Sequence, residues 1–426
     1  MRFTADLHIH SKYARAVSPK TNLPELDRWA DDKGITLMGT GDFTHPEYFK
    51  EITAQLTEAE QGLYKLKREY KLDTLKGFKS KKTRFILSSE VSSIYKRDGV
   101  TRRVHTLLFA PSISVAKKIN EKLGERGNLK SDGRPILGLD VRDIAEMVLN
   151  INERVLIVPA HIWTPWFSMF GSRSGFNSIK ECWGGYSRHI FAVETGLSSD
   201  PVMNWQVSEL DNLALISNSD SHSLERIGRE ANIFNTELSY DGVVKVLKDN
   251  SPKNFIATIE YYPEEGRYYH DGHKSCGVSL DPRTTRSNRG ICRVCKKPVV
   301  VGVLNRVQTL SDRRLDELKI KEVKIGKVIG KGIDGRVPFL NLVTLDSIIA
   351  EALGVKGVKT KAVTSIYKAL IQEFDNELDI LINIELQAVE KVAGARVGEA
   401  LRRMRVNEMN ITPGYDGEYG EVKIFS

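Results

Sequence analysis

The sequence of 426 residues lacks long hydrophobic runs: no apolar segment reaches the roughly 18 residues that a membrane-spanning helix needs. Its first residues, MRFTADLHIHSKY, place an acid and histidines where a signal peptide requires an apolar segment. We therefore expect a soluble, cytoplasmic protein without a membrane partner. Cysteine is also scarce. The four cysteines are too few to crosslink a chain of this length by disulfides. Three of them cluster, which favours metal binding over a disulfide framework.

Negative charge is scarce in one segment. The formal net charge is +8, and residues 267–330 hold 15 Lys and Arg against 6 Asp and Glu. The rest of the chain is close to neutral. A local excess of positive charge is typical of a surface that binds a polyanion, although it can also be a solvated face without a partner. We favour nucleic acid as the partner.

The order of apolar and amphipathic segments predicts an α/β fold. Over the first 240 residues, short apolar runs alternate with helical patterns, which favours parallel strands connected by helices. One helix is expected between Asn22 and Gly34, and another after Asp140. Residues 46–82 resemble an inserted Lys-rich helical segment, and residues 162–188 resemble a long loop.

Composition changes near residue 262 and again near residue 336. We expect three domains: an α/β domain over 1–262, a basic metal-binding module over 263–335 and a mainly helical domain over 336–426.

Polar residues of one chemical kind end the apolar runs. In a barrel of parallel strands, the carboxyl ends of the strands converge on one face, so these side chains are expected to meet there. A single histidine after a strand is usually a hydrogen-bonded surface or core group, so the prediction depends on the set. Seven of the nine histidines precede residue 263. Imidazoles and carboxylates that converge are ligands for Zn²⁺, Mn²⁺ or Fe²⁺. The candidate ligands are His8, His10, Asp42, His45, Glu90, His105, His161, Asp220 and His222.

These residues lie in motifs that resemble those of the PHP (polymerase and histidinol phosphatase) superfamily. The motifs are DLHIHS at 6–11, GDFTH at 41–45, SSE at 88–90, VH at 104–105, PAH at 159–161 and SDSH at 219–222. The resemblance implies a distorted (β/α)7 barrel, two or three catalytic divalent ions (Zn, Mg or Mn) and phosphoester hydrolysis.

By the same resemblance, the ions would be divided among the candidate ligands. One would lie between His8, His10, Glu90 and Asp220, and a second between Glu90, His105 and His161. A third would use His222 with Asp42 or His45. The sequence departs from the superfamily pattern in two places: Phe43 follows Asp42 where a histidine is usual, and no histidine follows the HIH motif closely.

Such a cluster suits phosphodiester hydrolysis, because metal ions neutralise the phosphate and activate water without a Ser or Cys nucleophile. Glu194 and Arg173 are candidate catalytic residues, for orienting the water and for contacting the phosphate. Each could equally be an ordinary surface residue.

The cysteines predict one structural zinc site. His273 and Cys276 are separated by two residues, as are Cys292 and Cys295, and fifteen residues lie between the pairs. This is the spacing of a two-knuckle zinc site with one Cys replaced by His. His270 is an alternative to His273, and Cys182 is expected to be a buried apolar residue. The zinc site would gather basic residues into one DNA-binding surface. These are Arg283, Arg286, Arg289, Arg293, Lys296 and Lys297.

The combination of the α/β domain with the zinc module resembles the endonuclease Q family of DNA repair enzymes. The resemblance implies cleavage of double- or single-stranded DNA on the 5′ side of a deaminated base (hypoxanthine, uracil or xanthine) or of an abasic site. A sliding clamp is a further candidate partner.

An enzyme of this kind needs a pocket for an everted base, and aromatic faces can offset the cost of unstacking it. The loop after His161 supplies the candidates, although such a loop could also simply pack onto the barrel. They are Trp163, Trp166, Phe167 and Phe170.

Two other functions fit parts of the sequence. A small-molecule phosphoesterase of the histidinol-phosphatase type would explain the α/β domain but not the basic and helical extension. A non-catalytic DNA-binding scaffold would explain the extension but not the nearly complete ligand set.

Overall fold

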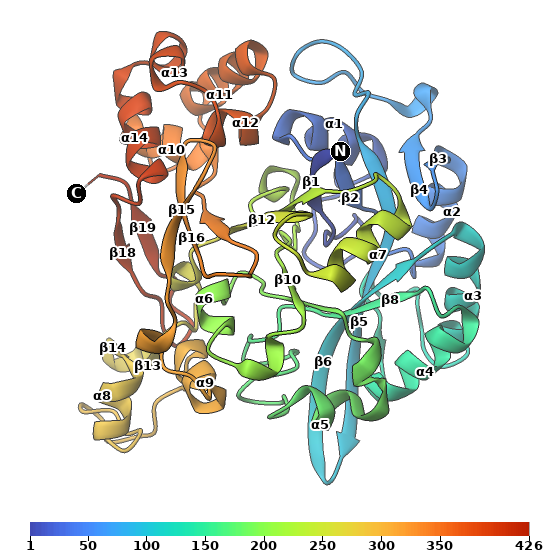
Figure 1. The fold of residues 1–426 in the computed structure, drawn as a ribbon, viewed down its shortest axis with the longest axis vertical. Coiled ribbons are helices and arrows are strands. Elements are labelled where there is room, and N and C mark those ends of the chain that lie inside the picture. The colour runs from blue at the N-terminus through green and yellow to red at the C-terminus, as the bar shows by residue number, and fades with distance from the viewer. Residues whose placement is uncertain (426) are drawn as a thin grey trace.

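A computed structural model of the protein describes residues 1–425 (Figure 1). The strands are β1 (Arg2–Asp6), β2 (Leu37–Gly39), β3 (Leu56–Glu60), β4 (Leu63–Leu66), β5 (Arg84–Arg97), β6 (Val100–Ala110), β7 (Ile136–Leu137), β8 (Leu156–Pro159), β9 (Ala192–Glu194), β10 (Ala214–Ile216), β11 (Ala231–Asn235), β12 (Phe255–Glu260), β13 (Asp271–His273), β14 (Val278–Leu280), β15 (Lys321–Ile325), β16 (Val328–Gly332), β17 (Phe339–Asn341), β18 (Asn410–Thr412) and β19 (Glu421–Lys423).

The α-helices lie between these strands and in the C-terminal part. They are α1 (Leu23–Lys33), α2 (Pro46–Gln55), α3 (Ile113–Gly124), α4 (Val141–Ile151), α5 (Ile179–Trp183), α6 (Pro201–Asn204), α7 (Tyr240–Asp249), α8 (Pro282–Ser287), α9 (Val303–Leu310), α10 (Leu345–Ala352), α11 (Lys361–Phe374), α12 (Glu377–Ile382), α13 (Leu386–Ala393) and α14 (Ala395–Arg405). Within residues 1–425, none of the helices combines the length and the apolar character required to cross a membrane.

The fold is mixed α/β, built on a sheet of thirteen strands. β1 pairs in parallel with β2, and β2 with β5, as the sequence predicts. The parallel arrangement holds only for part of the sheet, because β5–β6, β6–β8 and β1–β11 are antiparallel pairs. The strand pairing does not by itself confirm a closed barrel of seven strands, since β9 and β10 pair with each other outside the large sheet.

One turn accounts for the main antiparallel pair. Asp98 and Gly99 connect β5 to β6, and their φ angles are +52° and +76°. Positive φ at both central residues is typical of a type I′ turn, which Asp-Gly favours and which joins antiparallel strands tightly. The resulting hairpin is long and projects from the body of the molecule (Figure 1).

Local capping signals predicted two helices correctly. Asn22 accepts a hydrogen bond from the backbone N–H of Glu25 at the start of α1, and Gly34 ends that helix with φ +89°. Asp140 caps α4 in the same way. Residues 46–82 are α-helical only in α2, because the chain then forms the hairpin β3–β4, which a short 3-10 turn at Arg68–Tyr70 follows.

The C-terminal half joins the same sheet. β17 pairs in parallel with β12, and β15 and β16 extend the sheet from β17. Helices α10–α14 gather above this edge, as expected for a helical C-terminal region, and β13, β14 and α8 lie at the opposite end of it (Figure 1). The buried Lys33 Nζ on α1 lies 2.6 Å from Glu377 Oε2 on α12, which ties the helical region to the N-terminal part.

Candidate metal centre

Two histidines follow β1, and a carboxylate contacts the Nδ1 atom of each ring. His8 Nδ1 lies 3.0 Å from Glu194 Oε1, and His10 Nδ1 lies 2.9 Å from Asp42 Oδ1. All four side chains are buried. A carboxylate behind Nδ1 sets the orientation of the ring and leaves Nε2 available for a metal ion.

Glu90 on β5 lies between two pairs of histidines. Its Oε2 atom is 3.2 Å from His10 Nε2 and 3.6 Å from His8 Nε2. Its Oε1 atom is 2.7 Å from His105 Nδ1 on β6 and 3.0 Å from His161 Nε2 after β8. A carboxylate whose two oxygens face different ligand pairs can bridge two ions.

Asp220 completes the set around His8 and His10. Its Oδ1 atom lies 3.2 Å from His10 Nε2 and 3.6 Å from His8 Nε2. The φ angles of Asp220, Asp42 and His161 are +44°, +44° and +29°. Positive φ is uncommon and strained for residues other than glycine, and such strain is concentrated at functional sites.

Two ligand groups therefore share Glu90. Within each, the ligand atoms lie within 4.8 Å of one another. The groups are His8, His10, Glu90 and Asp220, and Glu90, His105 and His161. The buried atoms His8 Nε2, His10 Nε2 and Asp220 Oδ1 have no hydrogen-bond partner. Orphaned buried polar atoms are costly, and a divalent ion would satisfy all three. Imidazole nitrogen and carboxylate oxygen together fit Zn²⁺, Mn²⁺ or Fe²⁺.

The charges of the ligands are strongly coupled. Burial by itself lowers the pKa of His8, but Glu194, Asp220 and Glu90 raise that pKa well above its usual value. Burial by itself raises the pKa of Asp220, but the charges of His8 and His10 hold it well below its usual value. Metal ions bind deprotonated ligands, so loading this centre would release protons.

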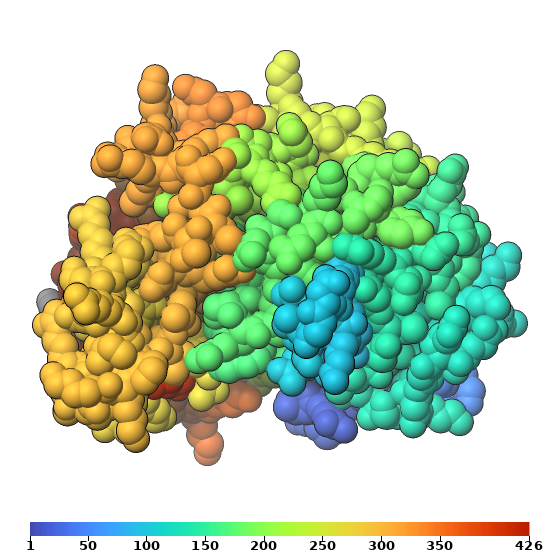
Figure 2. All heavy atoms as spheres, turned by 90° about the horizontal axis from the view of Figure 1, so that it is seen from below, coloured from blue at the N-terminus to red at the C-terminus, as the bar shows by residue number. Residues whose placement is uncertain are grey.

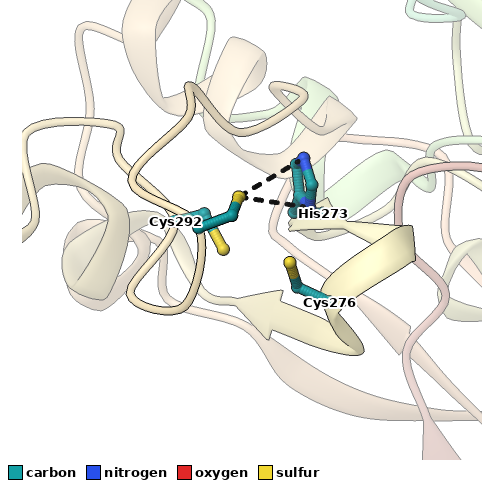
Figure 3. A group of neighbouring side chains, drawn as sticks. His273, Cys276 and Cys292 are labelled. Atoms are coloured by element: carbon teal, nitrogen blue, oxygen red, sulfur yellow. Dashed lines mark hydrogen bonds between the residues drawn. The ribbon is translucent and has the colours of Figure 1, made fainter.

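A separate site gathers the predicted zinc ligands. Their ligand atoms also lie within 4.8 Å of one another, and the four residues are His273, Cys276, Cys292 and Cys295. Figure 3 shows His273, Cys276 and Cys292 pointing toward one another from the β13–β14 hairpin and the following loop. His270 lies outside the group and stacks on Tyr269, with ring centroids 5.3 Å apart. Backbone N–H groups of Cys295 and Val294 lower the pKa of Cys292, as a metal-binding thiolate requires.

Two relatives of known sequence resemble this chain. Residues 344–408 match the family described as the MJ0043 C-terminal domain. The uncharacterized protein MJ0043 of Methanocaldococcus jannaschii is 31% identical over 268 residues, which cover 61% of this chain and 31% of that protein. The chain thus spans about a third of the length of that relative. The uncharacterized protein YqxK of Bacillus subtilis is 28% identical over 439 aligned residues, which cover 98% of each chain.

Two solved structures resemble the entire chain. The lesion-specific endonuclease PfuEndoQ from Pyrococcus furiosus has a TM-score of 0.82 and 29% identity, and covers 99% of this chain and 95% of its own. Endonuclease Q in complex with a 27-mer duplex substrate, with an abasic lesion at the active site, has a TM-score of 0.82 and 30% identity. That alignment covers 100% of this chain and 97% of the other. This chain belongs to the endonuclease Q family.

In this endonuclease Q family member, three predicted ligands lie outside the two groups. Asp42 orients His10, as described above. The ring of His45 stacks on that of Tyr13, with centroids 4.4 Å apart. His222 Nδ1 lies 2.9 Å from the backbone oxygen of Asp220, and its side chain is 33% exposed, so it flanks the centre. A third ion therefore stays a prediction.

The two predicted catalytic residues lie in different surroundings from those expected. Glu194 is fully buried, and its carboxylate faces His8 Nδ1, the backbone N–H of His161 and the side-chain amide of Asn218. Its carboxylate thus lies on the Nδ1 side of the His8 ring, away from the Nε2 atom that belongs to the ligand group. Arg173 is exposed and lies over the ring of Trp166, at 5.9 Å from the centroid.

Of the four candidate aromatic residues in the loop after His161, two are buried and two are partly exposed. Trp163 and Phe170 are 1% and 0% exposed and pack on each other in the core, so they do not line an open pocket. Phe167 is partly exposed and packs on His105, with ring centroids 4.9 Å apart. Trp166 is also partly exposed and meets Tyr268 edge to face at 5.5 Å.

Sequence reasoning missed Arg134. Its Nη1 atom lies 3.0 Å from Glu90 Oε2, so a guanidinium group reaches the metal centre. Arg134 lies in the segment between α3 and β7 and follows no strand, so the pattern of polar residues at strand ends could not reveal it. Only the pairing of β7 with β5 brings this segment beside Glu90.

The six predicted DNA-binding residues of the zinc module are all exposed. Within residues 1–425, none of the six has a carboxylate within 4.0 Å. Figure 2 shows the yellow and orange atoms of this module on one side of the molecule, with the tip of the β5–β6 hairpin projecting beside the green atoms of the 160–210 region. The basic module and the hairpin are thus presented on the same face.

Proposed function

We propose that this protein is a metal-dependent DNA repair endonuclease. It hydrolyses the phosphodiester bond on the 5′ side of a deaminated base (hypoxanthine, uracil or xanthine) or of an abasic site. The observation that carries the proposal is the pair of buried ligand groups that share Glu90, within a fold that matches endonuclease Q over the whole chain.

The residues of the centre prepare a site for phosphate. His8, His10, Asp220 and Glu90 would hold one ion, and Glu90, His105 and His161 a second. When bound, such ions neutralise the phosphate, lower the pKa of water and stabilise the leaving oxyanion. Glu194 and Asp42 act as positioning residues, because their hydrogen bonds fix the His8 and His10 rings.

We assign DNA binding to the basic module over 263–335. The zinc module, with Zn²⁺ held by His273 and the three cysteines, presents its exposed Arg and Lys side chains to phosphates and so positions the duplex without reading sequence. We keep the division into 1–262, 263–335 and 336–426 as a proposal. We also propose that 1–262 is a distorted (β/α)7 barrel, since the bridges Ile157–Ile190 and Ile9–Ser221 bring its remaining segments together. No feature of residues 1–425 supports a sliding clamp as a partner, and we propose none.

Trp166 and Phe167 are the side chains we propose for recognition of the everted base. Trp166→Ala should reduce cleavage of a uracil-containing duplex about 10-fold or more, because stacking on an aromatic ring contributes about 1–3 kcal/mol per base. Cleavage of an abasic duplex, which offers no base to stack, should change much less. The measurement is kcat/KM on both substrates, with Trp163→Phe as a core control. Equal losses on both substrates would contradict base recognition by Trp166.

The decisive experiment is to incubate the purified protein with labelled duplexes that each carry one damaged base, with Mg²⁺, Mn²⁺ or Zn²⁺ added after chelation. We expect a single nick on the 5′ side of the lesion that requires added metal. The position of the cut identifies both the reaction and the lesion.

Two outcomes would instead favour the other functions. Hydrolysis of a small phosphomonoester without binding to duplex DNA would favour a small-molecule phosphoesterase. Binding to duplex DNA without a nick under any metal would favour a non-catalytic scaffold.

A further inference from the structure

We propose that Arg134 contacts the phosphate that is being cleaved, through the donors it does not use on Glu90. This inference rests on the proposed endonuclease function and assigns a further residue to that reaction. It is based on the anchoring of the Arg134 backbone, on the free donors of its guanidinium group and on the charges of the metal centre.

The backbone around Arg134 is anchored on both sides. The N–H of Gly133 donates to the backbone oxygen of Tyr13 at 2.9 Å, and the N–H of Ser92 donates to that of Pro135 at 3.0 Å. The N–H of Arg134 itself donates to Asp132 Oδ1 at 3.1 Å. A side chain that projects from such a fixed segment is preorganised for binding.

The segment also packs directly against the metal centre. A Cβ atom at Gly133 would lie 2.4 Å from Asp42 Oδ2, on the carboxylate that orients His10, so only glycine fits there. The close approach places Arg134 beside the centre, next to the segment that follows β1. The guanidinium group therefore reaches Glu90 without any movement of the chain.

Most donors of the guanidinium group are still available. Nη1 donates to Glu90 Oε2 at 3.0 Å, whereas Nη2 and Nε have no hydrogen-bond acceptor among residues 1–425. A guanidinium group carries five N–H donors in a planar fork, which suits simultaneous contact with a carboxylate and a phosphate. The Arg134 side chain is 27% exposed, whereas that of Glu90 is 0% exposed. One nitrogen of the fork is thus used on Glu90, and the side chain is partly accessible from outside the centre.

The charges of the site support an anionic ligand at this position. Four carboxylates lie in or directly behind the two ligand groups: Glu90, Asp220, Asp42 and Glu194. Two divalent ions would balance these four negative charges, and Arg134 would then leave one positive charge in excess. A phosphodiester carries one negative charge, so it would neutralise the loaded site.

The test combines Arg134→Gln and Arg134→Lys with Arg15→Gln as the matched control. Arg15 interacts with the same Asp132, but its side chain is 77% exposed. We expect Arg134→Gln to lower kcat/KM on a lesion-containing duplex about 100-fold or more, the loss typical for one donor to transition-state charge. Arg134→Lys, which keeps the charge but not the fork, should be intermediate. The kcat/KM of Arg15→Gln should be close to that of the parent.

Three further measurements separate phosphate contact from an effect on Glu90. Metal content, measured by mass spectrometry, should be equal in the parent and Arg134→Gln. Inorganic phosphate should raise the melting temperature of the metal-loaded parent but not of the variant. Replacing the phosphodiester at the cleavage site by a neutral methylphosphonate should weaken DNA binding by the variant less than it weakens DNA binding by the parent.

Several results would overturn the inference. They are cleavage by Arg134→Gln within about 3-fold of the parent, loss of bound metal with recovery of cleavage at higher metal concentration, or an unchanged response to phosphate. If Arg134→Gln does not fold, the same measurements on Arg134→Lys decide. A parent that cuts no DNA but is stabilised by phosphate through Arg134 would contradict the endonuclease and support the phosphate contact.

Discussion

At the scale of single residues, each of the two histidines after β1 has a buried carboxylate within hydrogen-bond distance of Nδ1. Glu194 and Asp42 lie behind His8 and His10, so they orient the rings without occupying the ligand positions. Sequence reasoning selected both acids, Asp42 as a metal ligand and Glu194 as a catalytic residue, but could not show their hydrogen bonds to His10 and His8. A residue's place in the sequence shows that it is near a strand end, whereas its distance from the ion depends on how neighbouring strands are aligned.

Glu260, behind the centre, provides a pH prediction. It is fully buried at the end of β12, where burial raises its pKa from 4.5 to about 8. The folded protein therefore binds one proton more than the unfolded chain between these values, and the free energy of unfolding should fall as pH rises through this window. The slope for one proton is about 1.4 kcal/mol per pH unit. The Glu260→Gln variant should not show this decrease in the free energy of unfolding.

The measurement is the melting temperature of Glu260→Gln and of the parent from about pH 5 to about pH 10. The variant should gain stability relative to the parent as pH rises, and the gain should level off above pH 8. The exposed Glu146→Gln on α4 controls for removal of one acid. A difference that does not depend on pH would show that Glu260 is ionised in the folded protein.

At the scale of elements, packing between distant segments decides what local signals cannot. The caps of α1 and α4 were visible in the sequence, because Asn22, Gly34 and Asp140 act on their own helices. The adjacent Asp98 and Gly99 are also a local signal, because Asp-Gly favours the tight turn of a hairpin. The β3–β4 hairpin replaced a predicted helix because β4 pairs with β5, a tertiary contact that overrides helix propensity.

The contact between α1 and α12 makes a testable prediction. Lys33 and Glu377 form a buried ion pair, with side chains 3% and 4% exposed, and the hydroxyl of Tyr367 also donates to Glu377. Glu377→Gln keeps the acceptor but leaves the Lys33 charge without a partner. We expect it to lower the free energy of unfolding by about 3–5 kcal/mol, the loss typical for breaking a buried pair.

Urea-induced unfolding measures this effect. Asp375→Asn is the matched control, because Asp375 pairs with Lys76 across the same two regions but has a side chain that is 51% exposed. The control substitution should lower the free energy of unfolding by less than about 1 kcal/mol, because exposed ion pairs contribute little to stability. Equal losses in the two variants would contradict a special contribution from the buried pair.

At the scale of the whole molecule, charge is distributed unevenly. Residues 267–330 hold 15 Lys and Arg against 6 Asp and Glu, and the six basic residues around the zinc site are exposed. Duplex binding should therefore weaken as salt rises. Replacing Lys296 and Lys297 by Gln should reduce the slope of log Kd against log salt by about 0.9 for each phosphate that the variant no longer neutralises.

Fluorescence anisotropy of a labelled duplex over a range of salt concentrations measures the slope. The control removes the same charge from the exposed Lys117 and Lys118 of α3, on the opposite side of the molecule from the zinc module (Figure 1). This control should keep the parent's slope. A slope unchanged in Lys296→Gln/Lys297→Gln would exclude these two residues from the DNA-binding surface.

By itself the sequence determined the chemistry available to this protein: which imidazoles, carboxylates and thiols are present, and that they form a candidate metal centre and a candidate zinc site. Spacing sufficed for the zinc site, because its ligands are close along the chain. Only the tertiary structure decided which acids contact the ligand histidines, which aromatic rings are buried, and that Arg134 reaches Glu90. The reason is physical: these contacts join residues that are between 32 and 186 positions apart in the chain, and the pairing of the strands sets the distances between them.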